Sequence, residues 1–166
     1  MAIITLNNNS LSSVTSLPAG VGGKVLQVVN AESTTTVNLT STTYTDSSLS
    51  ASITPSSTSN KILVLINQEI AIHDTNDVIG GAVKILRDST TIYGGVTAFQ
   101  LYVQNTGGSV NNTQFYYPCN LNVLDSPSST SALTYKTQIR SYQAGDTIVS
   151  QPDSMESSIT LMEIAG

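Results

Sequence analysis

The chain has 166 residues, a formal net charge of −5 and only 10% charged residues, against roughly 25% in an ordinary soluble domain. This length fits one domain with a single core. Six Lys and Arg stand against eleven Asp and Glu, too few cations to neutralise a phosphate backbone, so a nucleic-acid binder is excluded. No apolar run approaches the roughly 18 residues of a membrane-spanning helix, and the N-terminus lacks the basic and apolar regions of a signal peptide.

The composition predicts an all-β domain. There are 24 serines and 22 threonines, and β-branched residues dominate the apolar stretches. Stiff χ1 angles and hydroxyl competition for the backbone disfavour helices, whereas the same residues suit extended strands. The single Cys119 forbids an internal disulfide, which fits folding in a reducing cytoplasm. So few charges on a polar surface indicate that much of it contacts another protein.

Residues 1–22 differ in composition from the rest. They are rich in Asn and Ser, end in Pro18 and several glycines, and carry apolar residues at irregular spacing. The segment is too short for a core, so we expect an extended arm that docks on another surface, followed by a glycine-rich linker. A disordered tail is the alternative. The apolar side chains expected to make that contact are Ile3, Ile4, Leu6, Leu11, Val14 and Leu17.

Strand patterns recur through residues 23–166 at a spacing typical of a sandwich or barrel. The apolar run 61–74 is predicted to be a central strand with both faces covered. Pro118 marks its strand as an edge or a bulge, and the final strand is expected inside a sheet. Connections of mixed length favour a jelly-roll-like antiparallel β-sandwich. The predicted strands are 23–29, 34–42, 48–55, 61–74, two within 81–95, 99–104, 113–124, 132–142, 146–152 and 157–166.

The search for catalytic chemistry finds no credible set. His73 with Asp74 and Asp77 resembles a metal site or an oriented general base, but one histidine and one cysteine do not supply a metal centre. A polar turn is therefore expected there. Cys119 has no basic neighbour in the sequence and is predicted to be a buried, inert thiol. We expect no catalytic, cofactor-binding or metal-binding residues, and no enzyme activity.

Two further predictions concern a charged turn and a set of four tyrosines. Lys84, Arg87 and Asp88 are predicted to form a turn with a local ion pair. Tyr93, Tyr102, Tyr116 and Tyr117 are interleaved with Asn and Gln. Such tyrosines are ordinary half-buried sheet residues, or they contact another protein or a glycan receptor.

Five segments in matching order resemble a family of small bacteriophage virion proteins and tail-fibre tips that is common in phages of cyanobacteria. The opening ITLNNNSLSSVTSLPAG (4–20) resembles the start of free-standing proteins of this type. The five segments are GKVLQVV (23–29), SITPSSTSNKILVLI (52–66), ILRDSTTI (85–92), LTYKTQIRSY (133–142) and SSITLMEIAG (157–166).

The resemblance implies a structural role on the virion, with no active site and jelly-roll domains packed as homotrimers. About twenty residues before the first strand favour a capsid cement, or decoration, protein that binds the major capsid protein at the capsid surface. The alternative is a tail-fibre or tailspike tip. Such a tip would bind a host-surface glycan, or contact another tail protein, through the loop 105–112 and the tyrosines.

Overall fold

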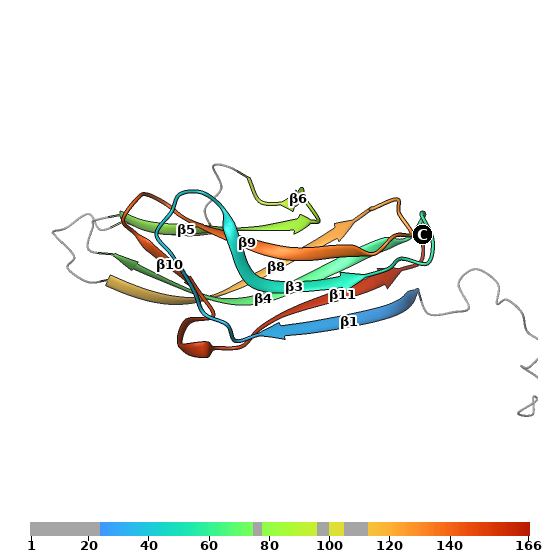
Figure 1. The fold of residues 1–166 in the computed structure, drawn as a ribbon, viewed down its shortest axis with the longest axis horizontal. Helices are drawn as coiled ribbons and strands as arrows, with labels where there is room; N and C mark the ends of the chain where they lie inside the picture. Colours follow the sequence, from blue (N-terminus) through green and yellow to red (C-terminus); the bar gives the residue numbers. More distant parts are fainter. Residues whose placement is uncertain (1–23, 75–77, 96–99, 105–112) are drawn as a thin grey trace, which may run out of the picture.

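The computed structural model describes residues 24–74, 78–95, 100–104 and 113–166, and these form strands joined by turns (Figure 1). The predicted arm, residues 1–22, lies outside the described residues. The strands are β1 (Val25–Ser33), β2 (Val37–Leu39), β3 (Thr45–Ile53), β4 (Lys61–Asp74), β5 (Val78–Arg87), β6 (Thr90–Tyr93), β7 (Leu101–Gln104), β8 (Thr113–Asp125), β9 (Leu133–Ser141), β10 (Thr147–Ser150) and β11 (Ser157–Ile164), with a 3-10 turn, η1 (Pro152–Ser154), before the last.

Two antiparallel sheets pack face to face as a sandwich (Figure 1). In sheet A, β1 pairs with β11, β11 pairs with the first half of β4, and β8 pairs with the opposite side of β4. Along the second half of β4, β10 takes the place of β11, and β2 pairs with β10. Sheet B has the order β3-β9-β5, and both β6 and β7 pair with β5. From β3 to β5 and from β7 to β11 the chain crosses between the sheets repeatedly, as in a jelly roll. The predicted all-β sandwich is confirmed.

The long strand β4 lies at the centre of sheet A. It pairs with β8 from Ile62 to Asp74, and on its other side with β11 and then β10. Its inner side chains are buried, but the outward Leu65 is 37% exposed. The prediction of a central strand is therefore confirmed. The prediction that both its faces are covered is wrong for the first half of the strand, where Leu65 is exposed, although Ala71 near the other end of the same outer face is 0% exposed.

Two other expectations about position are confirmed. β8, which contains Pro118, pairs only with β4 among the described strands, so the proline lies on an edge strand, where its missing N–H removes no ladder bond. The final strand β11 lies between β1 and β4.

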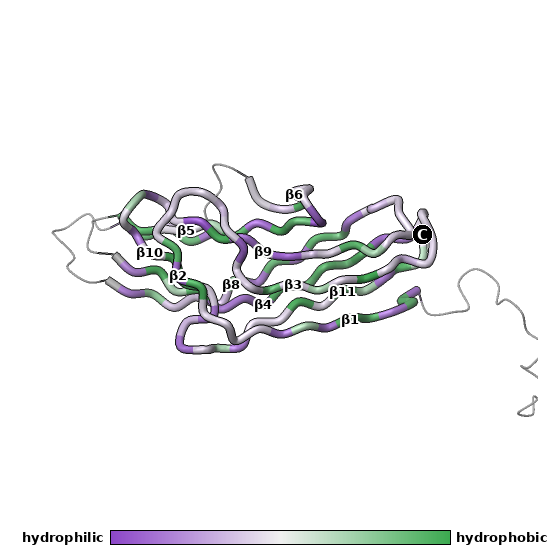
Figure 2. The backbone as a smooth tube through the Cα atoms, in the orientation of Figure 1, coloured by the Kyte–Doolittle hydropathy of each residue, from purple (hydrophilic) through white to green (hydrophobic). Residues whose placement is uncertain are grey.

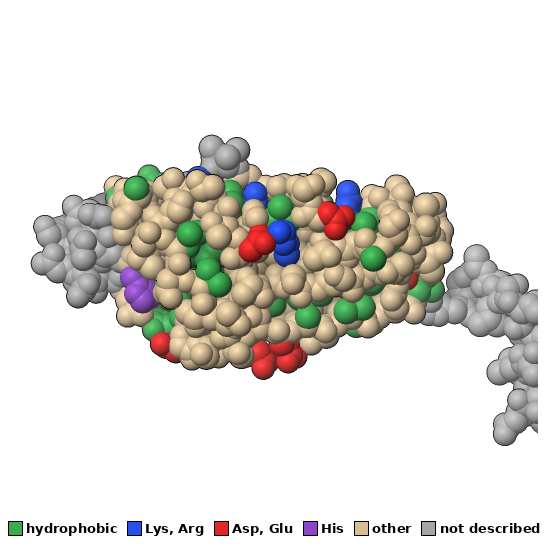
Figure 3. Space-filling view, in the orientation of Figure 1, with side chains coloured by type: hydrophobic (Ala, Val, Ile, Leu, Met, Phe, Trp, Pro, Cys, Tyr) green, Lys and Arg blue, Asp and Glu red, His purple; other side chains and the backbone are tan. Residues whose placement is uncertain are grey.

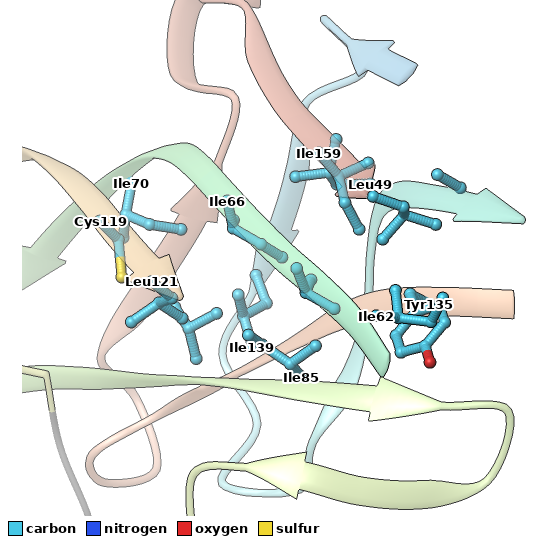
Figure 4. Packing of buried hydrophobic residues seen from close by; sticks show 14 of the residues in the cluster. Leu49, Ile62, Ile66, Ile70, Ile85, Cys119, Leu121, Tyr135, Ile139 and Ile159 are labelled. Carbon is cyan, nitrogen blue, oxygen red and sulfur yellow. The ribbon is translucent and has the colours of Figure 1, made fainter. Parts of the chain in front are cut away.

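The core fills the space between the two inner sheet faces (Figure 4). Its side chains alternate with outward polar ones, which produces the alternating colours along the strands in Figure 2. Ile62, Ile85, Ile139 and Ile159 from four strands are 0% exposed. Burying each such side chain contributes about 1.5–3 kcal/mol, and this burial holds the sheets together. Among the described residues, no helix is long and apolar enough to span a membrane.

Candidate functional site

A buried carboxylate, Glu163 of β11, binds the turn between β3 and β4. Its Oε1 accepts hydrogen bonds from the backbone N–H of Ser56 at 2.6 Å, the Ser56 hydroxyl at 2.8 Å and Asn60 Nδ2 at 2.6 Å. Its Oε2 accepts one from Gln27 Nε2 at 2.7 Å. Burial acts to raise the pKa of Glu163, but the hydrogen bonds from Asn60, Ser56 and Gln27 outweigh it and lower the pKa to about 2. Glu163 is therefore charged at neutral pH, and it forms no ion pair with any described residue.

A second polar cluster joins the two sheets. Arg87 at the end of β5 holds both oxygens of Asp125 on β8, at 2.8 and 2.6 Å. The hydroxyl of the buried Tyr135 on β9 donates to the same carboxylate at 2.8 Å. The predicted turn after Arg87 is confirmed, but the predicted local ion pair is wrong: Arg87 pairs with Asp125, and Asp88 accepts a hydrogen bond from the backbone of Thr134.

The two clusters lie at the same end of the sandwich. In sheet A, Ile62 pairs with Glu163 on one side and with Asp125 on the other. The residues of both clusters, Asp125 excepted, lie in the five segments that carry the family resemblance. The inward polar residues of those segments therefore help to hold the sandwich closed, and any site that contacts other molecules has to lie on its outer faces.

The outer face of sheet A carries an apolar surface at this same end. Val28, Met162, Leu63 and Leu124 form one row across four adjacent strands, and Val28 and Leu124 are 55% and 52% exposed. Green surface over β1 is visible along the lower edge of Figure 3. We define this apolar face by six outward residues from four strands: Leu26, Val28, Leu63, Leu124, Met162 and Ile164.

The outer face of sheet B has a different character. At outward positions β3 and β9 place Ser50 beside Lys136 and Ser52 beside Thr134, and Lys136 forms an ion pair of 2.8 Å with Asp46. A hydroxyl-rich face of this kind is satisfied by water. An exposed apolar row four strands wide is not, and such rows mark contacts with other proteins.

A shallow hollow of about 270 Å³ lies beside the apolar face, over the middle of sheet A. Its lining includes Leu65 and the side chains of Asn67, Asn120 and Asn122. These amides offer donors and acceptors to a partner whose apolar residues cover the adjacent row.

The four predicted contact tyrosines are all partly exposed, but they do not form one patch. Tyr93 and Tyr102 lie on β6 and β7 of sheet B, and Tyr102 packs edge-on against Tyr142 with ring centroids 5.3 Å apart. Tyr116 and Tyr117 lie on β8 of sheet A and are 45% and 39% exposed.

Tyr116 lines a groove at the other end of sheet A. Its hydroxyl donates to Asp153 Oδ2 at 2.8 Å and accepts a hydrogen bond from Gln114 Nε2, also at 2.8 Å. The same amide nitrogen lies 2.9 Å from His73 Nε2; because an amide nitrogen can only donate, this His73 nitrogen accepts. We call this hollow of about 310 Å³ the tyrosine groove, and its polar lining residues are Thr36, Asn38, His73, Gln114, Tyr116 and Asp153.

The remaining candidates from the sequence have structural explanations. The described residues hold no group of three His, Cys, Asp or Glu that could bind a metal, and Asp77 lies outside them. His73 is bonded to Gln114 at the edge of the groove. Cys119 is buried among the core side chains, and burial raises the pKa of its thiol to about 11, so its thiol is inert at neutral pH, as predicted.

Comparisons with known proteins do not assign a family. The sequence matches no protein-family model and no curated protein. Among solved structures, the chain is similar to the VP2 subviral particle of infectious bursal disease virus, with 14% identity, a TM-score of 0.34, and coverage of 84% of this chain and 38% of that chain. A structure of the Gx strain of the same virus gives 13% identity, a TM-score of 0.36, and coverage of 84% and 37%. The chain thus spans less than two fifths of those proteins, and these values are too low to carry a functional argument.

Proposed function

We propose that the protein is a structural component of a bacteriophage particle, a cement protein that binds the major capsid shell as a homotrimer. The observation that carries this proposal is the apolar face, which crosses four strands of sheet A and is left uncovered by the described chain. The sequence resemblance to small phage virion proteins gives the class of particle, and low surface charge (Figure 3) suits a protein whose surface meets other subunits.

The apolar face supports contact with another copy of the chain. Leu26, Val28 and Leu124 are 49%, 55% and 52% exposed, so covering these three contributes roughly 1 kcal/mol each, or about 3 kcal/mol per protomer. The other three side chains of the face are only partly exposed and add less. The amides of the adjacent hollow supply the polar pairing that fixes the register of such a contact.

The capsid attachment is assigned to residues 1–22. The first described residue, Lys24, comes directly before Val25 of β1, which lies at the end of the sandwich that carries the apolar face. A partner that binds only the assembled shell stabilises it by mass action. The protein folds in the host cytoplasm and acts at the capsid surface.

The experiment that tests location is quantitative mass spectrometry of this chain against the major capsid protein, on whole particles and on heads made without tails. Hundreds of copies retained on tailless heads support the cement role. A few copies that are lost with the tail contradict it and favour the alternative function, a tail-fibre or tailspike tip that binds a host-surface glycan. The tyrosine groove is the observation that supports that alternative.

The trimer is tested separately by substitution on the apolar face. Leu124→Asp should convert the trimer to a monomer in size-exclusion chromatography with light scattering, because a charge cannot be buried in an apolar contact. Ser50→Asp, an exposed change on the outer face of sheet B, is the matched control and should leave the trimer intact. An intact Leu124→Asp trimer would exclude the apolar face as the contact.

A further inference from the structure

We propose that the tyrosine groove binds one ring of a neutral saccharide. The groove lies on the outer face of sheet A, at the end opposite the clusters of Glu163 and Asp125. It is separate from the apolar face that we assign to the trimer. The proposal therefore holds whether the chain lies on the capsid or on the tail.

The first argument is backbone strain in the turn that forms one wall. Gln151, Asp153 and Ser154 all have left-handed backbone angles, with φ of 49°, 53° and 59°, although none is glycine. Such angles are unfavourable for L-residues with a side chain. The turn is held by hydrogen bonds from Gln151 N–H to the Glu69 carbonyl at 2.9 Å and from the Thr36 hydroxyl to the Gln151 carbonyl at 2.6 Å. A folded protein that maintains several strained residues in one turn indicates a functional demand on that turn.

The strained turn gives the Asp153 carboxylate a fixed position beside Tyr116. Asp153 is exposed and accepts the 2.8 Å bond from the Tyr116 hydroxyl through Oδ2. That hydroxyl also accepts from Gln114, so its proton is committed to Asp153 and the ring is held in one orientation. The result is a preorganised aromatic face with a carboxylate next to it. Such preorganisation lowers the entropic cost of binding.

The lining determines the class of ligand. A partly exposed tyrosine ring accommodates the C–H face of a sugar, while the carboxylate and the amides of Asn38 and Gln114 pair with hydroxyl groups. The described residues of the lining include an aspartate but no lysine or arginine, so an anionic sugar would meet an acid without a lysine or arginine to compensate it. The volume of about 310 Å³ is at the lower end of the ~300–1,000 Å³ of small-ligand sites, which fits one ring and not a long chain.

The test is saturation-transfer NMR on the full-length protein with five probes: the methyl glycosides of glucose, galactose, mannose and N-acetylglucosamine, and N-acetylneuraminic acid as the anionic comparator. We expect saturable binding in the millimolar range for at least one neutral glycoside and none for the anionic sugar. Tyr116→Ala and Asp153→Ala should each weaken that binding at least tenfold. Tyr93→Ala, which removes a tyrosine that is 37% exposed on sheet B, should leave it unchanged.

A second measurement keeps the proposal testable if a variant folds poorly. In the unaltered protein, the side-chain amide signals of Asn38 and Gln114 should shift as the bound glycoside is titrated, while the amides of Asn120 and Asn122, outside the groove, should not. Absence of binding by all neutral glycosides, binding that survives Tyr116→Ala in a folded variant, or shifts confined to other amides would each overturn the proposal.

Discussion

Replacing Glu163 with alanine should destabilise the whole sandwich, although Glu163 lies far from the centre of the core. The change removes the shared acceptor of four hydrogen bonds. Hydrogen bonds to charged groups contribute about 1.5–3 kcal/mol each, but the carboxylate also loses its hydration when it is buried, and water can reach some of the abandoned donors. We therefore expect a loss of about 3–5 kcal/mol, because each buried donor that is left without a partner costs about 1–3 kcal/mol. This is a large share of the 5–15 kcal/mol of a typical domain.

Urea unfolding at pH 7 measures this loss directly as a lower midpoint at unchanged slope, and thermal unfolding should show a melting temperature lower by roughly 10–15 °C. Glu163→Gln is the matched control. The glutamine keeps one acceptor oxygen for Asn60 and Ser56 but turns an amide N–H₂ toward Gln27. It should therefore lower the free energy of unfolding by less than the alanine change does. A loss below about 1 kcal/mol for Glu163→Ala would refute the reasoning, because it would mean that water replaces the carboxylate at no cost.

Three further predictions concern the pH response, the thiol and a glycine. The folded pKa of Glu163 is about 2 against an ordinary 4.5, so its contribution is fully present above about pH 4.5 and is lost as the pH falls through about 2; Glu163→Gln should flatten that part of the stability profile in acid unfolding. Cys119 should react with a thiol reagent at pH 8 only upon unfolding, and fast labelling of the native protein would contradict its burial. Gly80→Ala places a Cβ 2.8 Å from the Leu101 carbonyl oxygen and should lower the free energy of unfolding in urea by about 1–3 kcal/mol. Gly95→Ala, whose Cβ would have no atom of the described residues within 4 Å, should lower it far less.

The interaction surfaces show why the sequence predicted the strands better than the sites. The apolar face had a signal that the strand analysis interpreted as burial on both faces: β4 carries apolar side chains at both parities, whereas β9 alternates Leu and Tyr with Thr and Lys. Asp153 and Asn38 had no sequence signal for a binding site. A single aspartate in a polar turn has no distinguishing pattern until the fold brings Tyr116 beside it.

Local periodicity by itself determined the strands, because side-chain alternation is a property of consecutive residues. The predicted strand 61–74 has the same bounds as β4, Lys61–Asp74, and the expectation of an edge position at Pro118 followed from one missing N–H. Composition determined the fold class for the same reason, since χ1 stiffness acts residue by residue.

Only the tertiary structure decided which residues meet. Glu163 and Gln27 are separated by 136 positions, and no local pattern specifies that pairing; it follows from the register of β1 against β11. The groove likewise joins His73 and Asp153 through the pairing of β4 with β8 and a left-handed turn at non-glycine residues. Strand pairing and strained turns depend on packing over the whole sandwich, so they become visible only when the chain is folded.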